Sequence, residues 1–395
     1  MTLKGRDPSM PIDADRRRLI ALAAAAPVMA AAPAAFAAAS DWKDSVIVDA
    51  LGGLDDPNFY DMEGSGLGAS GPRKRRVLSP RVLDDARASG VSAINCTLGY
   101  VAGPAEPFEA TVSDIALYDR MVADYPDRLL KVAGAADILR AKREGKVGLI
   151  YGFQNAAMVG ANLDRIDMFA DLGVRIIQLT YNPANQIGDG STAPSNRGLT
   201  DFGRQVVERL NANRVMVDLS HSGERTCLDA IAASKQPISI NHTGCRALVD
   251  LPRNKTDEEL RLVAEKGGFV GIYFMPFLHK DGYVTGADVI AHIEHALDVC
   301  GEDHVGLGTD GVITKVDDLD RYRAAIAKEV AARKAAGIGA PGEKPDILKF
   351  AIDLRGPTQF HDLADRLKAR GHSTGRIEKI LGGNFVRYGR EVWGA

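Results

Sequence analysis

The chain has 395 residues, 45% hydrophobic and 26% charged, which is enough apolar material for a large buried core and excludes a disordered protein. Its 49 basic and 52 acidic residues give a net charge of −3. This balance argues against a nucleic-acid-binding protein, which needs a strongly basic surface.

The N-terminal segment resembles a twin-arginine export signal. Three consecutive arginines at 16–18 precede an uncharged, alanine-dominated stretch over 21–39, with a small-residue cleavage site at Ala35-Phe36-Ala37. We expect a signal peptide over 1–37, cleaved after Ala37, and a single periplasmic or secreted domain over 38–395. The alternative is a retained membrane anchor, but alanine is weakly apolar and the stretch contains two prolines. No other segment is long and apolar enough to span a bilayer.

The cysteines are scattered and form no CxxC pair, so we expect buried free thiols rather than a disulfide framework. They are Cys96, Cys227, Cys245 and Cys300.

Short apolar runs alternate with longer amphipathic segments along the rest of the chain. The apolar runs predict eight strands, at 46–48, 91–95, 147–151, 174–179, 215–219, 238–240, 269–273 and 305–307. The amphipathic segments predict helices, among them 115–123, 202–211, 224–233, 256–265 and 287–299. Thr256 and Glu259 form a capping box that marks the start of one helix.

Eight strand–helix alternations predict a parallel (β/α)8 TIM barrel, since eight repeats close a barrel. The alternative is an open, doubly wound sheet. The glycine-rich stretch 64–71 reads as a loop after the first strand, and 317–334 and 360–381 predict closing helices.

Polar side chains follow several of these strands. Gln154 follows the third strand, His221 the fifth, His242 the sixth and Asp310 the eighth. The carboxyl ends of barrel strands share one face, so we expect these side chains to converge there. Two imidazoles and a carboxylate can hold one divalent ion with an open position for water, which indicates a hydrolytic metal site.

Three further histidines in the second half of the chain are less suitable candidates for metal ligands. His292 and His295 lie in the predicted helix 287–299, on the outer ring of the barrel, and we interpret them as structural. His279 lies in the loop after the seventh strand, on the site face, where it is a reserve ligand or substrate contact.

From residue 46 to residue 393 the chain resembles the renal, or membrane, dipeptidase family, whose members are metal-dependent (β/α)8 barrels of the amidohydrolase superfamily. Five motifs carry the resemblance in order: VDLSHS at 217–222, INHTGCRAL at 240–248, PRNKTD at 252–257, HVGLGTDG at 304–311 and GGNF at 382–385.

The resemblance implies roles for several residues. Family members bind two zinc ions. His221 and His242 match the ligands of one ion, Arg253 matches an arginine that holds the substrate carboxylate, and Asp310 matches the acid that handles protons during attack on the carbonyl.

The sequence departs from the family at the other ion. The H-x-D motif after the first strand is replaced by Leu51 and Gly53, and the bridging glutamate by Gln154. Tyr181 stands where the family has a substrate-contacting histidine. Since only Asp310 remains of three carboxylates, two ions would leave an excess of about three positive charges in a pocket of low dielectric constant, which is costly.

We therefore predict a metallohydrolase that cleaves a dipeptide or similar small amide. It would hold one zinc ion through His221 and His242, with Asp310 as third ligand or general base, Gln154 polarising the water or carbonyl, and Arg253 and Tyr181 contacting substrate. The alternatives are a catalytically silent barrel that binds a small peptide-like ligand without metal, and a repurposed enzyme that tailors a secreted peptide. The expected partner is a small peptide-like molecule rather than a membrane, and a homodimer is compatible with the sequence.

Overall fold

A parallel β-sheet forms the centre of the structure, a computed structural model that describes residues 42–58 and 78–394. The predicted signal peptide and the glycine-rich stretch 64–71 lie outside these residues. The strands are β1 (Ile47–Gly53), β2 (Val91–Thr97), β3 (Leu129–Lys131), β4 (Val147–Phe153), β5 (Val174–Gln178), β6 (Met216–Asp218), β7 (Ser239–Thr243), β8 (Phe269–Ile272), β9 (Val305–Leu307) and β10 (Gly311–Val312).

The sheet returns to its own first strand and so forms a barrel. The strand order is β10-β1-β2-β4-β5-β6-β7-β8-β9, and β3 pairs with β4 at one side. Every ladder is parallel, and β10, which follows β9 after three residues, pairs with β1. The predicted parallel (β/α)8 fold is confirmed. All eight predicted strands are present, but β3 and β10 were not predicted.

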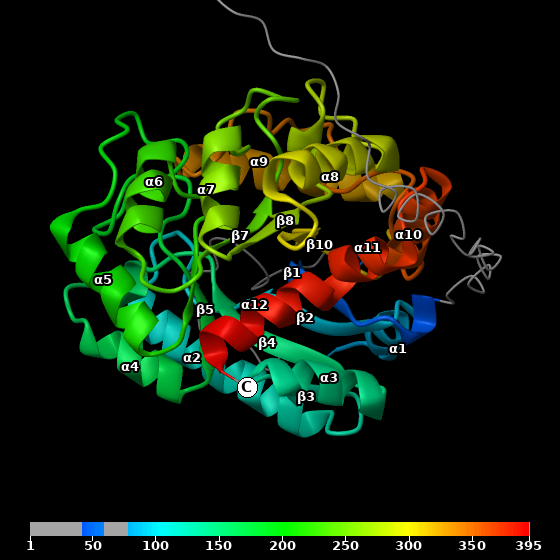
Figure 1. Cartoon of the computed structure of the whole chain (residues 1–395), viewed down its shortest axis with the longest axis horizontal. Coiled ribbons are helices and arrows are strands. Elements are labelled where there is room, and N and C mark those ends of the chain that lie inside the picture. The colour runs from blue at the N-terminus through cyan, green and yellow to red at the C-terminus, as the bar shows by residue number, and fades with distance from the viewer. Residues whose placement is uncertain (1–41, 59–77, 395) are drawn as a thin grey trace, which may run out of the picture. The chain divides into compact units, whose positions relative to one another are not determined.

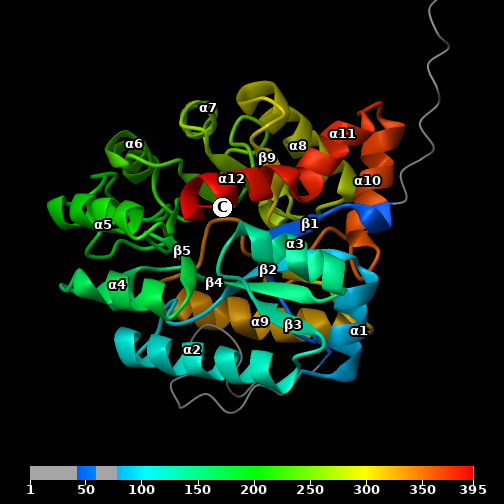
Figure 2. The ribbon, with the colours of Figure 1, turned by 60° about the horizontal axis from the view of Figure 1, so that its bottom comes forward.

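Helices surround the sheet on its outside (Figures 1 and 2). In the part of the chain that the structure describes, the α-helices are α1 (Pro80–Ala88), α2 (Pro107–Asp124), α3 (Ala135–Glu144), α4 (Asp164–Asp171), α5 (Asp201–Ala212), α6 (Glu224–Ala233), α7 (Asp257–Glu265), α8 (Gly286–Cys300), α9 (Leu319–Ala335), α10 (Gln359–Ala369), α11 (Thr374–Glu378) and α12 (Asn384–Trp393). Short turns are η2 (Trp42–Asp44), η3 (Ala157–Val159), η4 (Pro276–Leu278) and the π-helical η5 (Lys379–Gly383). None of the described helices is long and apolar enough to cross a membrane.

Local sequence explains where several helices begin. Thr256 accepts a hydrogen bond from the Glu259 backbone N–H, and the Glu259 side chain accepts one from the Thr256 N–H, so the predicted capping box is confirmed. Thr200 caps α5 in the same way through the Gly203 N–H. Most strand residues are buried, as the continuous apolar runs predict; all seven residues of β4 are buried, whereas both residues of β10 are partly exposed.

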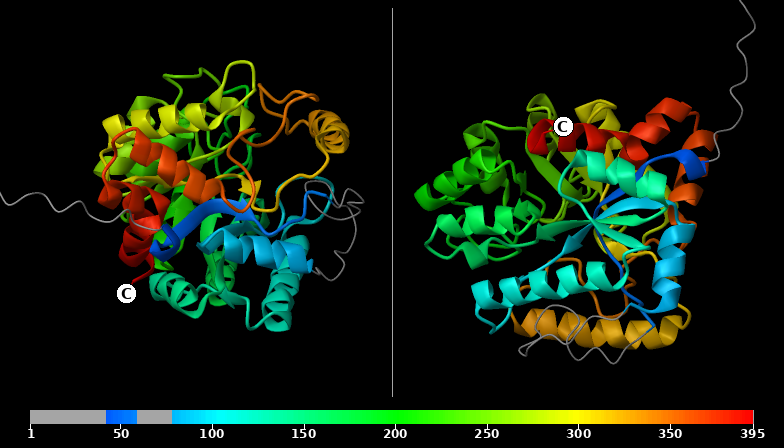
Figure 3. Two further views of the ribbon diagram at one scale, coloured as in Figure 1. Left: turned by 90° about the vertical axis from the view of Figure 1, so that its right-hand side faces the viewer. Right: turned by 90° about the horizontal axis from the view of Figure 1, so that it is seen from below.

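Two C-terminal segments cover opposite sides of the sheet (Figure 3). At the amino ends of the strands, η5 and α12 pack against β1 and β9; Asn384 donates hydrogen bonds to the Glu302 and Val305 carbonyls at 2.8 Å each. Gly382 is required here, because a Cβ would lie 2.5 Å from the Val46 carbonyl oxygen. The segment 360–381, predicted to supply closing helices, contains α10, α11 and the first part of η5. Helix α9 lies at the carboxyl ends of the strands.

Asp310 lies in the turn between β9 and β10, where the barrel closes. Its backbone has a φ of +54°, a left-handed conformation that aspartate tolerates better than most residues. The Asp310 N–H donates to the Leu51 carbonyl of β1 at 2.8 Å. The turn therefore holds the Asp310 carboxyl group beside the first strand.

Candidate active site

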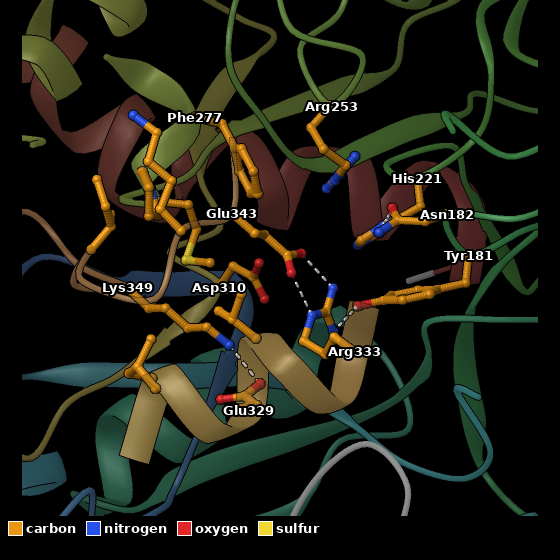
Figure 4. Close-up of a pocket in the computed structure, with 16 residues that line it drawn as sticks. Tyr181, Asn182, His221, Arg253, Phe277, Asp310, Glu329, Arg333, Glu343 and Lys349 are labelled. Atoms are coloured by element: carbon orange, nitrogen blue, oxygen red, sulfur yellow. Dashed lines mark hydrogen bonds and ion pairs between the residues drawn. The ribbon is translucent and has the colours of Figure 1, made fainter. Parts of the chain in front are cut away.

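A cavity of ≈ 170 Å³ opens at the carboxyl ends of the strands. The barrel contributes Tyr181, His221, Arg253 and Asp310, which we had predicted as site residues. Helix α9 and the segment 343–349 line the other side (Figure 4). The structure thus brings together side chains from the loops that follow four strands, β5, β6, β7 and β9, under a helix that follows the last strand.

His221 is held on its edge and on its face. Its Nδ1 lies 2.6 Å from Asn182 Oδ1, and its ring stacks on Tyr181 with 4.2 Å between centroids. Its Nε2 is buried without a hydrogen-bond partner among the described residues. Burial, and then the positive charge of Arg253, hold the His221 pKa well below its usual value, so the ring is neutral.

His242 lies beside His221, with 4.9 Å between ring centroids. It is the fourth residue of β7 rather than a residue after the strand. Neither of its ring nitrogens has a hydrogen-bond partner among the described residues, and burial holds its pKa well below its usual value. Two adjacent neutral imidazoles with unpartnered nitrogen atoms therefore lie together; His221 lines the cavity, whereas His242 is buried behind it and is not a lining residue.

Buried hydrogen bonds between β6 and β7 bring the two histidines together. Asp218 Oδ1 accepts hydrogen bonds from Ser220 Oγ at 2.5 Å and from the Asn241 N–H at 3.0 Å. Ser220 Oγ in turn accepts one from the His242 N–H at 3.1 Å. Asp218 and Ser220 thereby fix the two strand ends that carry His221 and His242.

Arg253 offers one free edge of its guanidinium group. The side chain is 1% exposed, and its Nη1 donates to the Ser220 carbonyl at 2.5 Å. Its Nη2 is buried and has no partner among the described residues. A buried cationic donor without a partner is costly, and a ligand carboxylate would supply the missing acceptor.

Asp310 lines the cavity opposite these groups. Burial raises the Asp310 pKa to about 6, while Arg253 opposes this rise. A carboxyl group with this pKa can both accept and donate a proton near neutral pH, which suits a general acid or base.

Helix α9 contributes a buried ion pair that sequence reasoning missed. Arg333 is 6% exposed; its Nη2 lies 2.6 Å from Glu343 Oε1, and its Nη1 donates to the Tyr181 hydroxyl at 3.0 Å. Figure 4 shows these three side chains in contact along one side of the cavity. No local pattern identifies Arg333, because its partner Tyr181 lies 152 positions away in the sequence.

Gln154 does not lie among the residues that line this cavity. It follows β4 as predicted, but its Nε2 donates to Thr97 Oγ1 at 2.6 Å. Leu51 is 2% exposed within β1, and Gly53 is the last residue of that strand. No side chain at these three positions supplies a charged metal ligand.

The remaining histidines and the cysteines are placed outside the cavity lining. Both His292 and His295 lie in α8; His292 is buried and its Nδ1 accepts from the Cys245 N–H at 2.8 Å, and His295 Nε2 lies 2.7 Å from Asp257 Oδ1. His279 is not among the lining residues. All four cysteines are buried, and none of them forms a disulfide bond.

The donor set beside the cavity is smaller than that of a usual catalytic metal site. His221 and His242 present unpartnered neutral nitrogens, the form in which imidazole binds zinc. Among residues 42–58 and 78–394, no three His, Cys, Asp or Glu side chains lie close enough together to hold a metal ion. The described residues therefore provide two ligands, where catalytic zinc commonly has three.

The sequence and the structure are similar to those of known dipeptidases and amidohydrolases. Residues 86–337 match the family described as membrane dipeptidase, peptidase family M19. Dipeptidase tcpJ of Claviceps purpurea is 30% identical over 288 residues, which cover 71% of this chain; the match spans 60% of the length of that relative.

Two solved structures extend the similarity. An amidohydrolase from Pseudomonas aeruginosa superposes with a TM-score of 0.73 at 32% identity, covering 89% of this chain and 98% of that one. A metallopeptidase from Rhodobacter sphaeroides, solved with a phosphinate mimic of the dipeptide L-Ala-D-Ala, superposes with a TM-score of 0.66 at 20% identity, covering 88% of this chain and all of that one. The second likeness concerns the fold alone.

Proposed function

Because the chain belongs to the membrane dipeptidase family, we propose that it hydrolyses a dipeptide or a similar small amide in the cavity beside His221. One observation carries the proposal: Arg253 and His221 line the same cavity, and each has a buried polar nitrogen without a partner. A peptide-like substrate carries a carboxylate for the first group, next to an amide carbonyl that must be polarised or attacked.

In this proposal the chain's own residues bind the substrate and move a proton. The substrate carboxylate accepts hydrogen bonds from Arg253 Nη2, which sets the position of the scissile bond. Asp310 accepts a proton from the attacking water and returns it to the leaving amine, as its pKa of about 6 allows. The ring of Tyr181, fixed by Arg333, forms one wall of the site.

His221 and His242 would hold one metal ion, most suitably zinc, through their unpartnered nitrogens. A zinc ion bound there would lower the pKa of water and polarise the substrate carbonyl. With two protein ligands, the ion would bind less tightly than a three-ligand site and would leave positions for water and substrate. A second ion is unfavourable because Leu51, Gly53 and Gln154 supply no charge.

Metal content and turnover, measured together, test the proposal. We expect purified protein to bind about one zinc ion, and to cleave members of a dipeptide panel that includes D-residues at the carboxyl end. His221→Ala should abolish both properties. His295→Ala is a matched control, because His295 pairs with Asp257 and does not line the cavity. Full activity in protein without metal would contradict the one-zinc form of the proposal.

The second candidate function is binding of a small peptide-like ligand without hydrolysis. The absence of a third metal ligand near His221 and His242, among the residues that the structure describes, favours it. It predicts that dipeptides bind in calorimetry, that Arg253→Ala weakens binding, and that no product forms with or without zinc. Robust cleavage that is lost in His221→Ala would exclude it. A repurposed enzyme that tailors a secreted peptide would differ from both candidates. It would bind dipeptides only weakly in calorimetry and would not cleave them.

We also propose export to the periplasm through the segment 1–37. The consecutive arginines 16–18 before an alanine-rich stretch support this location. Replacing Arg17 and Arg18 by lysine should retain the protein in the cytoplasm and leave the uncleaved chain, which fractionation and mass measurement would detect. Unchanged export of this variant would contradict the twin-arginine route.

A further inference from the structure

Asn182 contacts both the candidate active site and the segment that covers it. This residue follows β5, immediately after Tyr181, and is completely buried. Its Oδ1 lies 2.6 Å from His221 Nδ1, and its Nδ2 lies 2.8 Å from the carbonyl oxygen of Ile338, which follows α9. Figure 4 shows Asn182 against the His221 ring.

The two contacts determine the position of a proton. A backbone carbonyl oxygen only accepts hydrogen bonds, so the Asn182 amide nitrogen must face Ile338. The Asn182 amide oxygen therefore faces His221, and an amide oxygen only accepts. His221 Nδ1 must then carry the proton and donate it. In a neutral ring this leaves His221 Nε2 as a lone pair, which is the atom without a partner in the cavity.

Neighbouring residues complete the surroundings of the His221 ring. Ser191 Oγ lies 3.4 Å from Asn182 Oδ1, a contact that a hydroxyl group can make with either end of an amide, so the Ile338 carbonyl alone decides the orientation. Tyr181 stacks on the His221 ring and is itself fixed by Arg333. Tyr181 thus contacts the face of the His221 ring and Asn182 contacts its edge. Both residues are also hydrogen-bonded to the segment 333–338.

We infer that Asn182 is a positioning residue, which fixes His221 with Nε2 as a lone pair toward the cavity and takes its own orientation from the Ile338 carbonyl. The inference deepens the proposed function, on which it rests for the role of His221, by naming what prepares this ring to bind a cation or accept a proton. Outer contacts of this kind orient histidine ligands in metal sites and change metal affinity by about 10- to 100-fold.

Long-range 1H–15N NMR spectra of histidine-labelled, metal-free protein measure the tautomer directly. The signals missing from His221→Gln assign His221 among the eight histidines of the chain. We expect a protonated Nδ1 and a bare Nε2 at neutral pH in the unmodified protein. A His221 protonated mainly at Nε2 would overturn the inference; the tautomer is read in the unmodified protein, and the variant serves only for assignment.

Three variants test the role of the amide. In Asn182→Ala the proton of His221 should no longer be confined to Nδ1, so that both tautomers are populated. Zinc binding should weaken by about 10- to 100-fold in calorimetry. Asn182→Asp keeps an acceptor for His221 and should keep Nδ1 protonated. Asn185→Ala is the matched control: this amide lies in the same loop but donates to Asn155 and to the Leu179 carbonyl. An unchanged tautomer in Asn182→Ala, or an equal change in Asn185→Ala, would contradict the positioning role.

The tautomer and the catalytic measurements can fail separately. The expected spectrum in a protein that cleaves no dipeptide supports the positioning of His221 while the proposed hydrolysis fails. Dipeptide turnover by a protein whose His221 is protonated at Nε2 leaves the proposed function intact and removes Asn182 from it.

Discussion

Asp49 of β1 binds Thr309 through both of its carboxylate oxygens. Oδ1 accepts from the Thr309 N–H at 2.7 Å, and Oδ2 accepts from the Thr309 hydroxyl at 2.6 Å. These bonds join the first strand to the turn that contains Asp310. The Asp49 carboxyl is 1% exposed, and burial raises its pKa to about 7, although the bonds from Thr309 and the Leu51 N–H lower it.

The raised pKa of Asp49 predicts a pH-dependent stability. The folded protein keeps a proton on Asp49 between an ordinary pKa of 3.8 and about 7, whereas the unfolded chain has released it. The free energy of unfolding should therefore fall as pH rises through this window, with a slope of up to about 1.4 kcal/mol per pH unit from this group. Asp49→Asn should flatten the slope in urea unfolding of metal-free protein. An identical slope in the variant would show that Asp49 ionises normally.

Arg253→Lys should weaken recognition of a free carboxylate. Lysine cannot donate to the Ser220 carbonyl and to a ligand in the same fixed geometry, so we expect kcat/KM for dipeptides to fall about 10- to 100-fold. A substrate with a carboxamide in place of the carboxylate provides the control. The unmodified protein should discriminate against it, and the variant should discriminate much less. Equal losses for both substrates would mean that Arg253 does not contact the carboxylate.

Glu343→Gln should destabilise the protein by about 3–5 kcal/mol, because it leaves the buried Arg333 guanidinium without its counter-charge. The two side chains are 7% and 11% exposed. Arg261 and Glu265 form a comparison pair that is 49% and 57% exposed, so Glu265→Gln should cost less than about 1 kcal/mol. Chemical unfolding measures both. Similar values for the two variants would contradict a buried, tightly coupled pair beside the cavity.

Restoring the lost ligands should add a second ion. The triple variant Leu51→His, Gly53→Asp and Gln154→Glu supplies one imidazole and two carboxylates, which offset the charge of another zinc ion. A side chain at Gly53 is tolerable, because its Cβ would meet the flexible Asp55 side chain at 3.0 Å. Elemental analysis should show one more zinc per chain than the starting protein. The neutral variant Leu51→Gln and Gly53→Asn, with Gln154 kept, should show no gain.

The barrel was predicted correctly because eight of its strands are each marked by a short apolar run in the local sequence. The eight apolar runs are strands, and four of the predicted site residues, Tyr181, His221, Arg253 and Asp310, line one cavity. β10 was missed because two residues, Gly311 and Val312, form no recognisable run. Sequence position also could not show that Gln154 turns to Thr97 rather than into the cavity.

The cover of the site could not be read from the sequence. Helix α9 was predicted only as a closing helix, and nothing in its pattern indicates that it lies over the strand ends. Asn182 bonds His221 at a separation of 39 residues and Ile338 at 156. A polar residue three positions after the predicted strand 174–179 was the available signal for Asn182. Contacts between residues this far apart in the sequence come from the tertiary fold.

The left-handed backbone conformation at Asp310 affects which site residues can be replaced when a protein of this fold loses catalytic activity. The backbone there favours a short polar side chain such as aspartate, whether or not water is activated nearby. Position 310 is thus held by conformation, while the end of β1, where Leu51 and Gly53 lie, carries no such constraint. Sequence drift away from catalysis in this barrel should accumulate first at the end of its opening strand and last at the turn that closes it.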